Sequence, residues 1–505
     1  MMTADTAYAK LIRATQEAGL LDSCAELLAW DEDTCMPAGG VAHRGKQMAL
    51  LAGLVHDRWT DRRLGEWLSA IEGSSLVSDP HSAEAVNVRE LRRAYDRARR
   101  LPRSLVEELA QVTSIAHQEW AIARRRSDFA RFQPWLERIV TLKRCEVESL
   151  GWETESYDAL LDEYEPGARA RPLSQLLETL CEELAPLVAA ISGAKRQANV
   201  SILTRRFPLQ RQRTFAQKAA AAVGFDFARG RLDSTTHPFF ASIGPGDVRI
   251  TTRYALKRFG EAFFATLHEV GHGLYEQGLP PDHHGSPMGD APSLGMHESQ
   301  ARLWENAVGR SRGFWQHLFP LARTMFPTAL RDVKLDDFFR AIHHVAPSMN
   351  RVGADEVTYN LHIRVRFELE RALIHGDLAS ADLPAAWNEA YRRYLGVVPA
   401  DDAEGCLQDS HWAAGMFGYF PSYTLGNVFA AQLTARAVED LGDLNVQFAR
   451  GEFEPLRDWL TQRIYAEGGR FTAAQLIKRV TGTPPDHRPL IAALGREYGE
   501  LYGVA

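Results

Sequence analysis

The chain has 505 residues, of which 45% are hydrophobic and 24% are charged, as in an ordinary globular protein. Its formal net charge of −7 argues against a nucleic-acid-binding role based on bulk charge, and no run of about eighteen apolar residues predicts a membrane span. The five cysteines are scattered and odd in number, and the N-terminus lacks a signal-peptide pattern. These features predict a cytoplasmic protein with reduced thiols.

Most of the chain is predicted to be helical, because apolar residues recur at spacings of three and four in segments rich in Ala, Leu, Glu and Arg. Examples of such segments are residues 6–30, 84–126 and 172–198. Clusters of Pro and Gly predict breaks at residues 36–40, 165–172 and 240–247. No repeat, low-complexity tract or long Ser/Gly linker marks a boundary. We therefore expect one domain over residues 1–505, of the all-α class with a small β-sheet.

Residues 247–253 are predicted to form a strand, because they follow a Gly-Pro-Gly turn and are rich in β-branched side chains. Val248 and Ile250 alternate with Arg249 and Thr251. The strand would lead directly into the helix described next. A strand beside a catalytic site commonly offers its free edge to an extended peptide. A small structural hairpin is the alternative.

The most informative segment is HEVGH at residues 268–272, within a predicted helix over residues 254–277. A helix turns about 100° per residue, so His268 and His272 lie one turn apart on the same face. Two neutral imidazoles in this position can bind one Zn²⁺ and leave room for a third protein ligand and a water. Glu269 lies on the neighbouring flank, where it can accept a proton from that water. The segment is typical of a zinc hydrolase.

A five-residue pattern also occurs by accident, but the context favours a metal site. The apolar residues of the predicted helix form a stripe that would face the core, at Leu256, Phe259, Phe263, Leu267, Val270 and Leu274. Both histidines lie off this stripe, whereas histidines of a core would lie on it.

A third metal ligand is predicted on a second helix that starts near Ser293. Glu298 lies 26 residues after His272, far enough for the chain to loop out and return on an adjacent helix. His297 points about 100° away from Glu298 and is a weaker candidate. Glu305 lies on the same face as Glu298, where it could accept a hydrogen bond from a ligand histidine or serve as a buried structural carboxylate.

The ordered motifs of the chain resemble those of the Taq-type thermostable carboxypeptidase family. These motifs are HPF at 237–239, DVRIT at 247–251, HEVGH at 268–272, HESQ at 297–300, NRVGAD at 350–355 and GCLQDSHW at 405–412. The block at residues 27–52 is similar to the Trp-Asp, Met-Pro and Gly-Gly signature of that family. The resemblance therefore covers nearly the whole chain.

The resemblance implies a zinc or cobalt metallocarboxypeptidase that is almost entirely helical, with its site at the floor of a deep groove. It also implies a homodimer and a fold related to those of neurolysin-like and angiotensin-converting-enzyme-like peptidases. His268, His272 and Glu298 fall on the metal ligands of the family and Glu269 on its catalytic base. Gly353 stands where a more usual member carries a glutamate, a departure that affects local packing more than chemistry.

Peptide-bond hydrolysis builds negative charge on the carbonyl oxygen, so hydrogen-bond donors must be aimed at it. His411, Tyr419 and Tyr423 are candidates for this role, and Gln408 and Asp409 are candidates for orienting His411. The tyrosines share a face if their segment is helical, which the proline between them makes uncertain. Each tyrosine could instead be a core aromatic whose hydroxyl finds a backbone carbonyl.

An enzyme that cuts at the C-terminus must also bind a free carboxylate, and arginine suits this because its planar fork can contact both oxygens. Arg351 is the first candidate and Arg249 the second. His237 would either contact substrate or anchor the entry of the strand.

We therefore predict a metal-dependent carboxypeptidase of broad specificity that releases single residues from the C-terminus of peptides, with Zn²⁺, or Co²⁺ in its place, as cofactor. The alternatives are a zinc oligoendopeptidase or a dipeptidyl carboxypeptidase on the same fold. A non-catalytic helical binding protein is a more distant alternative.

Overall fold

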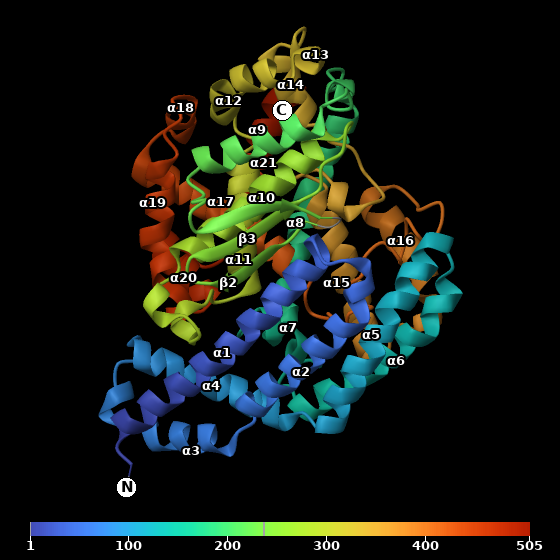
Figure 1. Ribbon diagram of the computed structural model, residues 1–505. Coiled ribbons are helices and arrows are strands. Elements are labelled where there is room, and N and C mark those ends of the chain that lie inside the picture. The colour runs from blue at the N-terminus through green and yellow to red at the C-terminus, as the bar shows by residue number, and fades with distance from the viewer. Residues whose placement is uncertain (1, 236–237, 505) are drawn as a thin grey trace.

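The computed structural model describes residues 2–235 and 238–504. Within these residues the chain is mainly helical and contains one small three-stranded sheet, which confirms the predicted fold class (Figure 1). None of the described helices combines the length and apolar character that crossing a bilayer requires. All five cysteines are free.

The N-terminal part consists of six helices, coloured blue to cyan in Figure 1. Their bounds are α1 (Ala4–Thr34), α2 (Val41–Trp59), α3 (Arg62–Ile71), α4 (Ala83–Arg100), α5 (Arg103–Arg126) and α6 (Phe129–Leu150). Helices α1, α3 and α4 share a small apolar core of their own, separate from the main core. The predicted helical segment 84–126 is divided between α4 and α5, because Pro102 cannot continue a helix.

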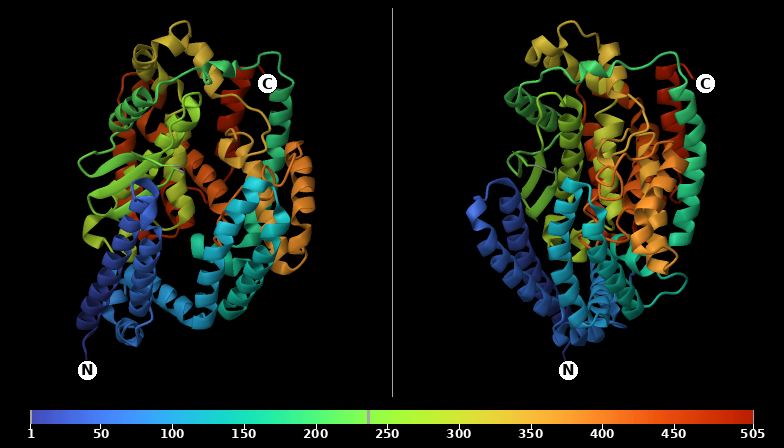
Figure 2. Two further views of the ribbon diagram at one scale, coloured as in Figure 1. Left: turned by 45° about the vertical axis from the view of Figure 1, so that its right-hand side comes forward. Right: turned by 90° about the vertical axis from the view of Figure 1, so that its right-hand side faces the viewer.

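The central part carries the sheet and the helices around it. Its elements are α7 (Asp158–Tyr164), α8 (Ala170–Ser192), α9 (Leu209–Ala222), β1 (Gly230–Ser234), β2 (Phe240–Gly244), β3 (Asp247–Thr252), α10 (Phe259–Gly278) and α11 (Leu294–Arg302). A π-helical turn over Leu303–Val308 continues α11. The sheet lies on α10, and α1 reaches it at β2 (Figures 1 and 2).

The C-terminal part is again helical and, with the central part and helices α5 and α6, forms the main core. Its helices are α12 (Arg312–Met325), α13 (Pro327–Leu330), α14 (Leu335–Ile342), α15 (Tyr359–His375), α16 (Leu383–Leu395), α17 (Pro421–Leu441), α18 (Leu444–Ala449), α19 (Glu454–Arg463), α20 (Ala473–Thr481) and α21 (Arg488–Tyr502). Helix α17 runs through this part and packs against α11, α15, α20 and α21.

The sheet has the strand order β1-β3-β2. The predicted strand is present as β3, but it is the central strand, paired in parallel with β1 and antiparallel with β2. The expectation that it offers a free edge is therefore wrong. Neither partner strand was predicted from the sequence. Strand β2, at residues 240–244, lies where a break between helices was predicted. Strand pairing depends on contacts between separate segments, which local composition does not reveal.

Helix α10 begins at Phe259, five residues later than predicted, and Leu256 precedes it with 42% of its surface exposed. The rest of the predicted apolar stripe, from Phe259 to Leu274, is buried as expected. One side of α10 faces β3 and another faces α11. The helix that carries both histidines is therefore held rigidly between the sheet and its neighbour.

Candidate metal centre

Three side chains from two helices converge on one point, and they are the predicted metal ligands. A nitrogen or oxygen atom from each of His268, His272 and Glu298 lies within 4.8 Å of those from the other two. The Nε2 atoms of His268 and His272 lie 3.6 and 3.7 Å from Oε2 of Glu298. Two ligands with bonds of about 2.1 Å in a tetrahedral site are about 3.4 Å apart. The spacing therefore fits a single cation of the size of Zn²⁺.

Two glycines allow the helices to approach closely enough for this convergence. A Cβ on Gly271 of α10 would lie 2.5 Å from the carbonyl oxygen of Gln300 on α11. A Cβ on Gly426 of α17 would overlap the Cγ atom of Glu298. Real Cβ atoms essentially never come within 3.0 Å of another heavy atom. The position of Glu298 therefore depends on the absence of a side chain on both sides of α11.

His268 is oriented by a carboxylate behind it. Its Nδ1 atom lies 3.0 Å from Oε2 of Glu305, which leaves Nε2 facing the centre. Glu305 therefore contacts His268 as an acceptor would, which is one of the two roles that the sequence left open for it. Arg302 donates from Nε to Glu298 at 2.7 Å and from Nη1 to Glu305 at 3.2 Å, and it stacks on the ring of Tyr359. These contacts fix both carboxylates in place.

The electrostatics of the centre favour a positive charge. Burial lowers the pKa of His268, but the carboxylates of Glu298 and Glu305 outweigh this effect and raise the pKa above its usual value. Burial lowers the pKa of His272 well below its usual value, which keeps this imidazole neutral, as a metal ligand must be. A divalent cation would therefore replace the proton that His268 otherwise attracts.

Glu269 lies beside the ligands and is buried, with 6% of its surface exposed. Burial raises its pKa to about 7, and the negative charges of Glu298 and Glu305 act in the same direction while His268 opposes them. A carboxylate with a pKa near neutrality can both take up and release a proton at the pH of a cell. The side chain thus has the protonation chemistry expected of a general base.

His411, Tyr419 and Tyr423 form one cluster. Nε2 of His411 lies 3.3 Å from the hydroxyl of Tyr423, and its ring centroid lies 5.2 Å from that of Tyr419. Tyr419 precedes α17 and Tyr423 lies in its first turn, upstream of the glycine that faces Glu298. Burial raises the pKa of Tyr419 to about 12, so its phenol stays protonated. Burial lowers the pKa of His411 to about 3, so the imidazole is neutral.

Arg351 is buried and already engaged by protein groups. Its Nε and Nη2 atoms donate to Oδ1 of Asp409 at 3.1 and 2.9 Å, and Nη1 donates to the hydroxyl of Tyr359 at 2.9 Å. Arg366 donates to the other oxygen of Asp409 at 2.8 Å. Two guanidinium groups thus face one carboxylate, which leaves a net positive charge. The ring of Tyr423 lies 4.7 Å from the Arg351 guanidinium, next to the oxyanion candidates.

The remaining predicted residues contact partners other than those predicted for them. Arg249 pairs with Asp247 at 2.8 Å and stacks on Trp30 of α1 at 4.3 Å, so its guanidinium ties α1 to β3. Gln408 binds Arg351 and Arg366 instead of His411, and the nearest Asp409 oxygen lies 4.0 Å from Nδ1 of His411. His237 lies outside the described residues.

Several residues of the centre were missed by sequence reasoning although their spacing offered a signal. Arg302 lies four residues after Glu298, and Glu276 lies four residues after His272, the separation at which helical side chains meet. Glu276 accepts a hydrogen bond from His297, whose other ring nitrogen contacts His272. His297 therefore contacts the predicted ligand His272 and lies outside the cluster of the three predicted ligands.

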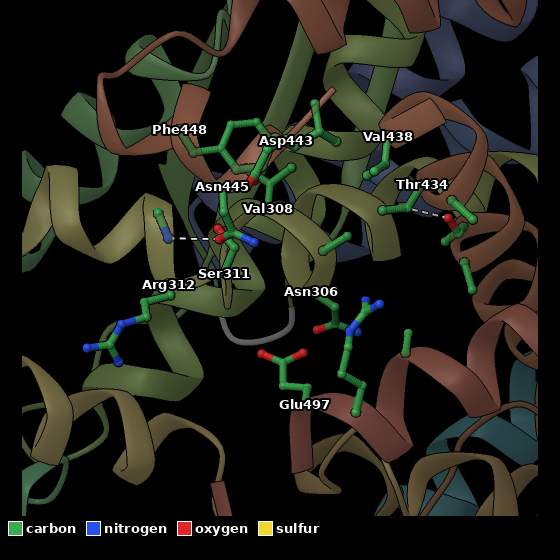
Figure 3. A pocket seen from close by; sticks show the side chains of 18 of the residues that line it. Asn306, Val308, Ser311, Arg312, Thr434, Val438, Asp443, Asn445, Phe448 and Glu497 are labelled. Carbon is green, nitrogen blue, oxygen red and sulfur yellow. Dashed lines mark hydrogen bonds between the residues drawn. The ribbon is translucent and has the colours of Figure 1, made fainter. Parts of the chain in front are cut away.

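A separate cavity of about 1430 Å³ opens between α12, α17, α18 and α21, and Figure 3 shows part of its lining. Asn306, Asp443 and Glu497 point into it from different elements. Its lining includes Arg302 but none of His268, Glu269, His272 and Glu298. The cavity therefore shares Arg302 with the candidate metal centre, but the side chains that converge at the centre do not line it.

Comparisons with known proteins agree with this geometry. Residues 10–498 match the family described as carboxypeptidase Taq (M32) metallopeptidase. The chain is 52% identical to thermostable carboxypeptidase 1 of Thermus thermophilus, over 99% of this chain and 100% of that relative. It is 38% identical to carboxypeptidase 1 of Bacillus subtilis, over 94% of this chain and 95% of that relative.

Solved structures show the same similarity. The M32 carboxypeptidase from Deinococcus radiodurans R1 aligns with a TM-score of 0.95 and 39% identity, over 99% of this chain and 100% of that one. The carboxypeptidase from Pyrococcus furiosus aligns with a TM-score of 0.93 and 32% identity, over 97% and 99%.

Proposed function

Because this chain belongs to the carboxypeptidase Taq (M32) metallopeptidase family and is a metal-dependent carboxypeptidase, we propose that Zn²⁺ is its cofactor and Glu269 its general base. We assign His268, His272 and Glu298 as the metal ligands. Two neutral imidazoles and one carboxylate are a donor set for Zn²⁺, and Co²⁺ can replace it. The convergence of these three groups beside a buried glutamate carries the proposal.

When bound, the cation supplies Lewis-acid chemistry, which lowers the pKa of water and polarises the scissile carbonyl. Glu269 removes a proton from the attacking water and later delivers it to the departing amine. His411, Tyr419 and Tyr423 stabilise the negative charge that develops on the carbonyl oxygen. The raised phenol pKa of Tyr419 and the proximity of His411 to Tyr423 support this assignment, because the hydroxyls remain donors.

We assign the substrate's C-terminal carboxylate to the neighbourhood of Arg351, with Arg249 as the second candidate. Asp409 holds Arg351 in one orientation, and Arg366 adds a second positive charge beside it. An arginine fixed in this way loses little conformational freedom when it binds an anion. Arg249 fits the role less well because its pair with Asp247 offsets its charge, whereas Arg351 and Arg366 together exceed the charge of Asp409.

A substitution of the base tests the chemistry. Glu269→Gln should retain the metal and lower kcat by at least about a hundredfold, because an amide cannot accept the proton. Glu261→Gln is the matched control, since Glu261 is an exposed residue of the same helix. Full activity of Glu269→Gln would remove Glu269 from the mechanism.

Amidation of the substrate tests the mode of cleavage. An amidated C-terminus should block hydrolysis of a short peptide, because the enzyme requires the free carboxylate. Mass spectrometry should detect single residues released from the unmodified peptide. Release of dipeptides, or undiminished cleavage of the amidated peptide, would favour the dipeptidyl carboxypeptidase or the oligoendopeptidase.

We also propose that the protein is a cytoplasmic homodimer. The five free cysteines support a reducing compartment, and the family resemblance supports the dimer. Light scattering coupled to size exclusion would give a mass of one chain if the dimer is wrong.

A further inference from the structure

A chain of hydrogen bonds leads from His272 away from the metal centre. Nδ1 of His272 lies 2.6 Å from Nδ1 of His297, and Nε2 of His297 lies 2.8 Å from Oε1 of Glu276. The hydroxyl of Ser242, on β2, donates to the other oxygen of Glu276 at 2.7 Å. His272 and His297 are both buried, so these contacts are made within the protein.

The positions of the protons in this chain follow from its two ends, the carboxylate of Glu276 and the metal-binding nitrogen of His272. Burial alone would raise the pKa of Glu276, but the hydrogen bonds from His297 and Ser242 bring it below its usual value, so the carboxylate is ionised. An ionised carboxylate only accepts hydrogen bonds, and Nε2 of His297 must therefore carry a proton. If Nε2 of His272 binds the metal, Nδ1 of His272 carries the proton and donates to Nδ1 of His297, which is then the acceptor. The lone pair of Nε2 of His272 is directed toward Glu298 and the metal.

The surroundings hold both rings in this arrangement. The ring of Phe240 packs against His272 and His297 at centroid distances of 4.6 and 4.7 Å, and Tyr275 contacts His297 at 5.1 Å. Phe240 and Ser242 belong to the same strand, so β2 both packs against the rings and supplies the donor to Glu276. The edge strand is thereby coupled to one metal ligand.

We propose that His297 and Glu276 are positioning residues that lock His272 in its metal-binding tautomer through a relay of two histidines. Glu305 holds the tautomer of His268 in the same way, through a direct contact with its Nδ1 atom. The proposal rests on the assignment of His272 as a metal ligand and adds residues that touch neither the metal nor the substrate. Removal of such a partner typically lowers metal affinity about 10- to 100-fold.

Glu276→Gln tests the relay with little change of shape. The amide of the glutamine can donate to Nε2 of His297. Nδ1 of His297 can then donate to Nδ1 of His272, which places the proton of His272 on its Nε2 atom. We therefore expect the Zn²⁺ dissociation constant, measured by chelator competition, to rise about 10- to 100-fold. KM should change little, because the relay does not contact substrate. Glu261→Gln should bind Zn²⁺ like the natural chain.

A double variant separates a relay from general damage to the fold. Because Glu276 acts through His297, Glu276→Gln combined with His297→Phe should bind Zn²⁺ no more weakly than His297→Phe alone. Losses that add, or a Glu276→Gln affinity within about twofold of the natural chain, would overturn the relay. If His297→Phe does not fold, Glu276→Gln decides alone. Failure of the metal centre itself is distinguishable, because the natural chain would then bind no Zn²⁺ or His268→Ala would bind it normally.

Discussion

Gly426→Ala should disturb the metal centre from outside it. The added Cβ would overlap Cγ of Glu298 and lie 2.8 Å from its Cβ, and both atoms belong to a buried carboxylate on a packed helix. The side chain of Glu298 cannot swing aside, because Arg302 holds it at 2.7 Å and the centre lies on its other side. Helix α17 must therefore shift away from α11.

Overpacking of this kind costs about 1–3 kcal/mol. The entropy of unfolding is about 2.1 cal/mol/K per residue, which gives about 1.1 kcal/mol/K for the 505 residues of this chain unfolding as one unit. The midpoint of thermal unfolding should therefore fall by about 1–3 °C. The Zn²⁺ affinity should fall as well, because Glu298 and the tyrosines at the start of α17 move relative to the histidines.

Calorimetry and chelator competition measure the two effects. Gly495→Ala is the matched control, because Gly495 lies within α21 and a Cβ there meets no atom within 4 Å. Alanine at that position should stabilise the protein by about 0.5–1 kcal/mol. The packing argument is wrong if Gly426→Ala keeps both its unfolding midpoint and its Zn²⁺ affinity.

Three further predictions follow from the site and the core. His268→Ala or Glu298→Ala should lose the bound metal in plasma emission spectroscopy, and undiminished metal content would remove that residue from the ligands. Tyr423→Phe should lower kcat about a hundredfold with little change in KM, because an oxyanion donor acts mainly in the transition state; a kcat within about twofold of the natural value would contradict this. Glu370 is fully buried, and burial raises its pKa to about 7. Because the folded state holds its proton more tightly than the unfolded chain, the stability that Glu370 contributes is complete below about pH 4.5 and is lost as the pH rises through about 7. Urea unfolding of Glu370→Gln should lack this decline of up to a few kcal/mol, and an unchanged pH profile would refute the assignment.

The chemistry that could be predicted from sequence depends on local spacing. The separation of His268 and His272 by one helical turn is a property of any helix, and so is the appearance of Glu298 in a helix capped by Ser293. The same rule places Glu305 near the proposed ligands, where it contacts His268. The pattern of apolar residues likewise predicted a mainly helical chain, and its main error at α10 was the position of one end.

The features that the sequence did not predict depend on contacts between segments that lie far apart along the chain. Whether β3 has a free edge depends on β1 and β2, whose pairing leaves no periodic signal in either strand. The sequence did not show that Asp409, 58 residues away, fixes the orientation of the Arg351 guanidinium. The two histidines of the relay lie 25 residues apart, and their ring contact is created by the packing of α11 against α10. Helix periodicity acts over a few residues and sets which side chains share a face, whereas hydrogen bonds between distant segments require the whole core to bring them together.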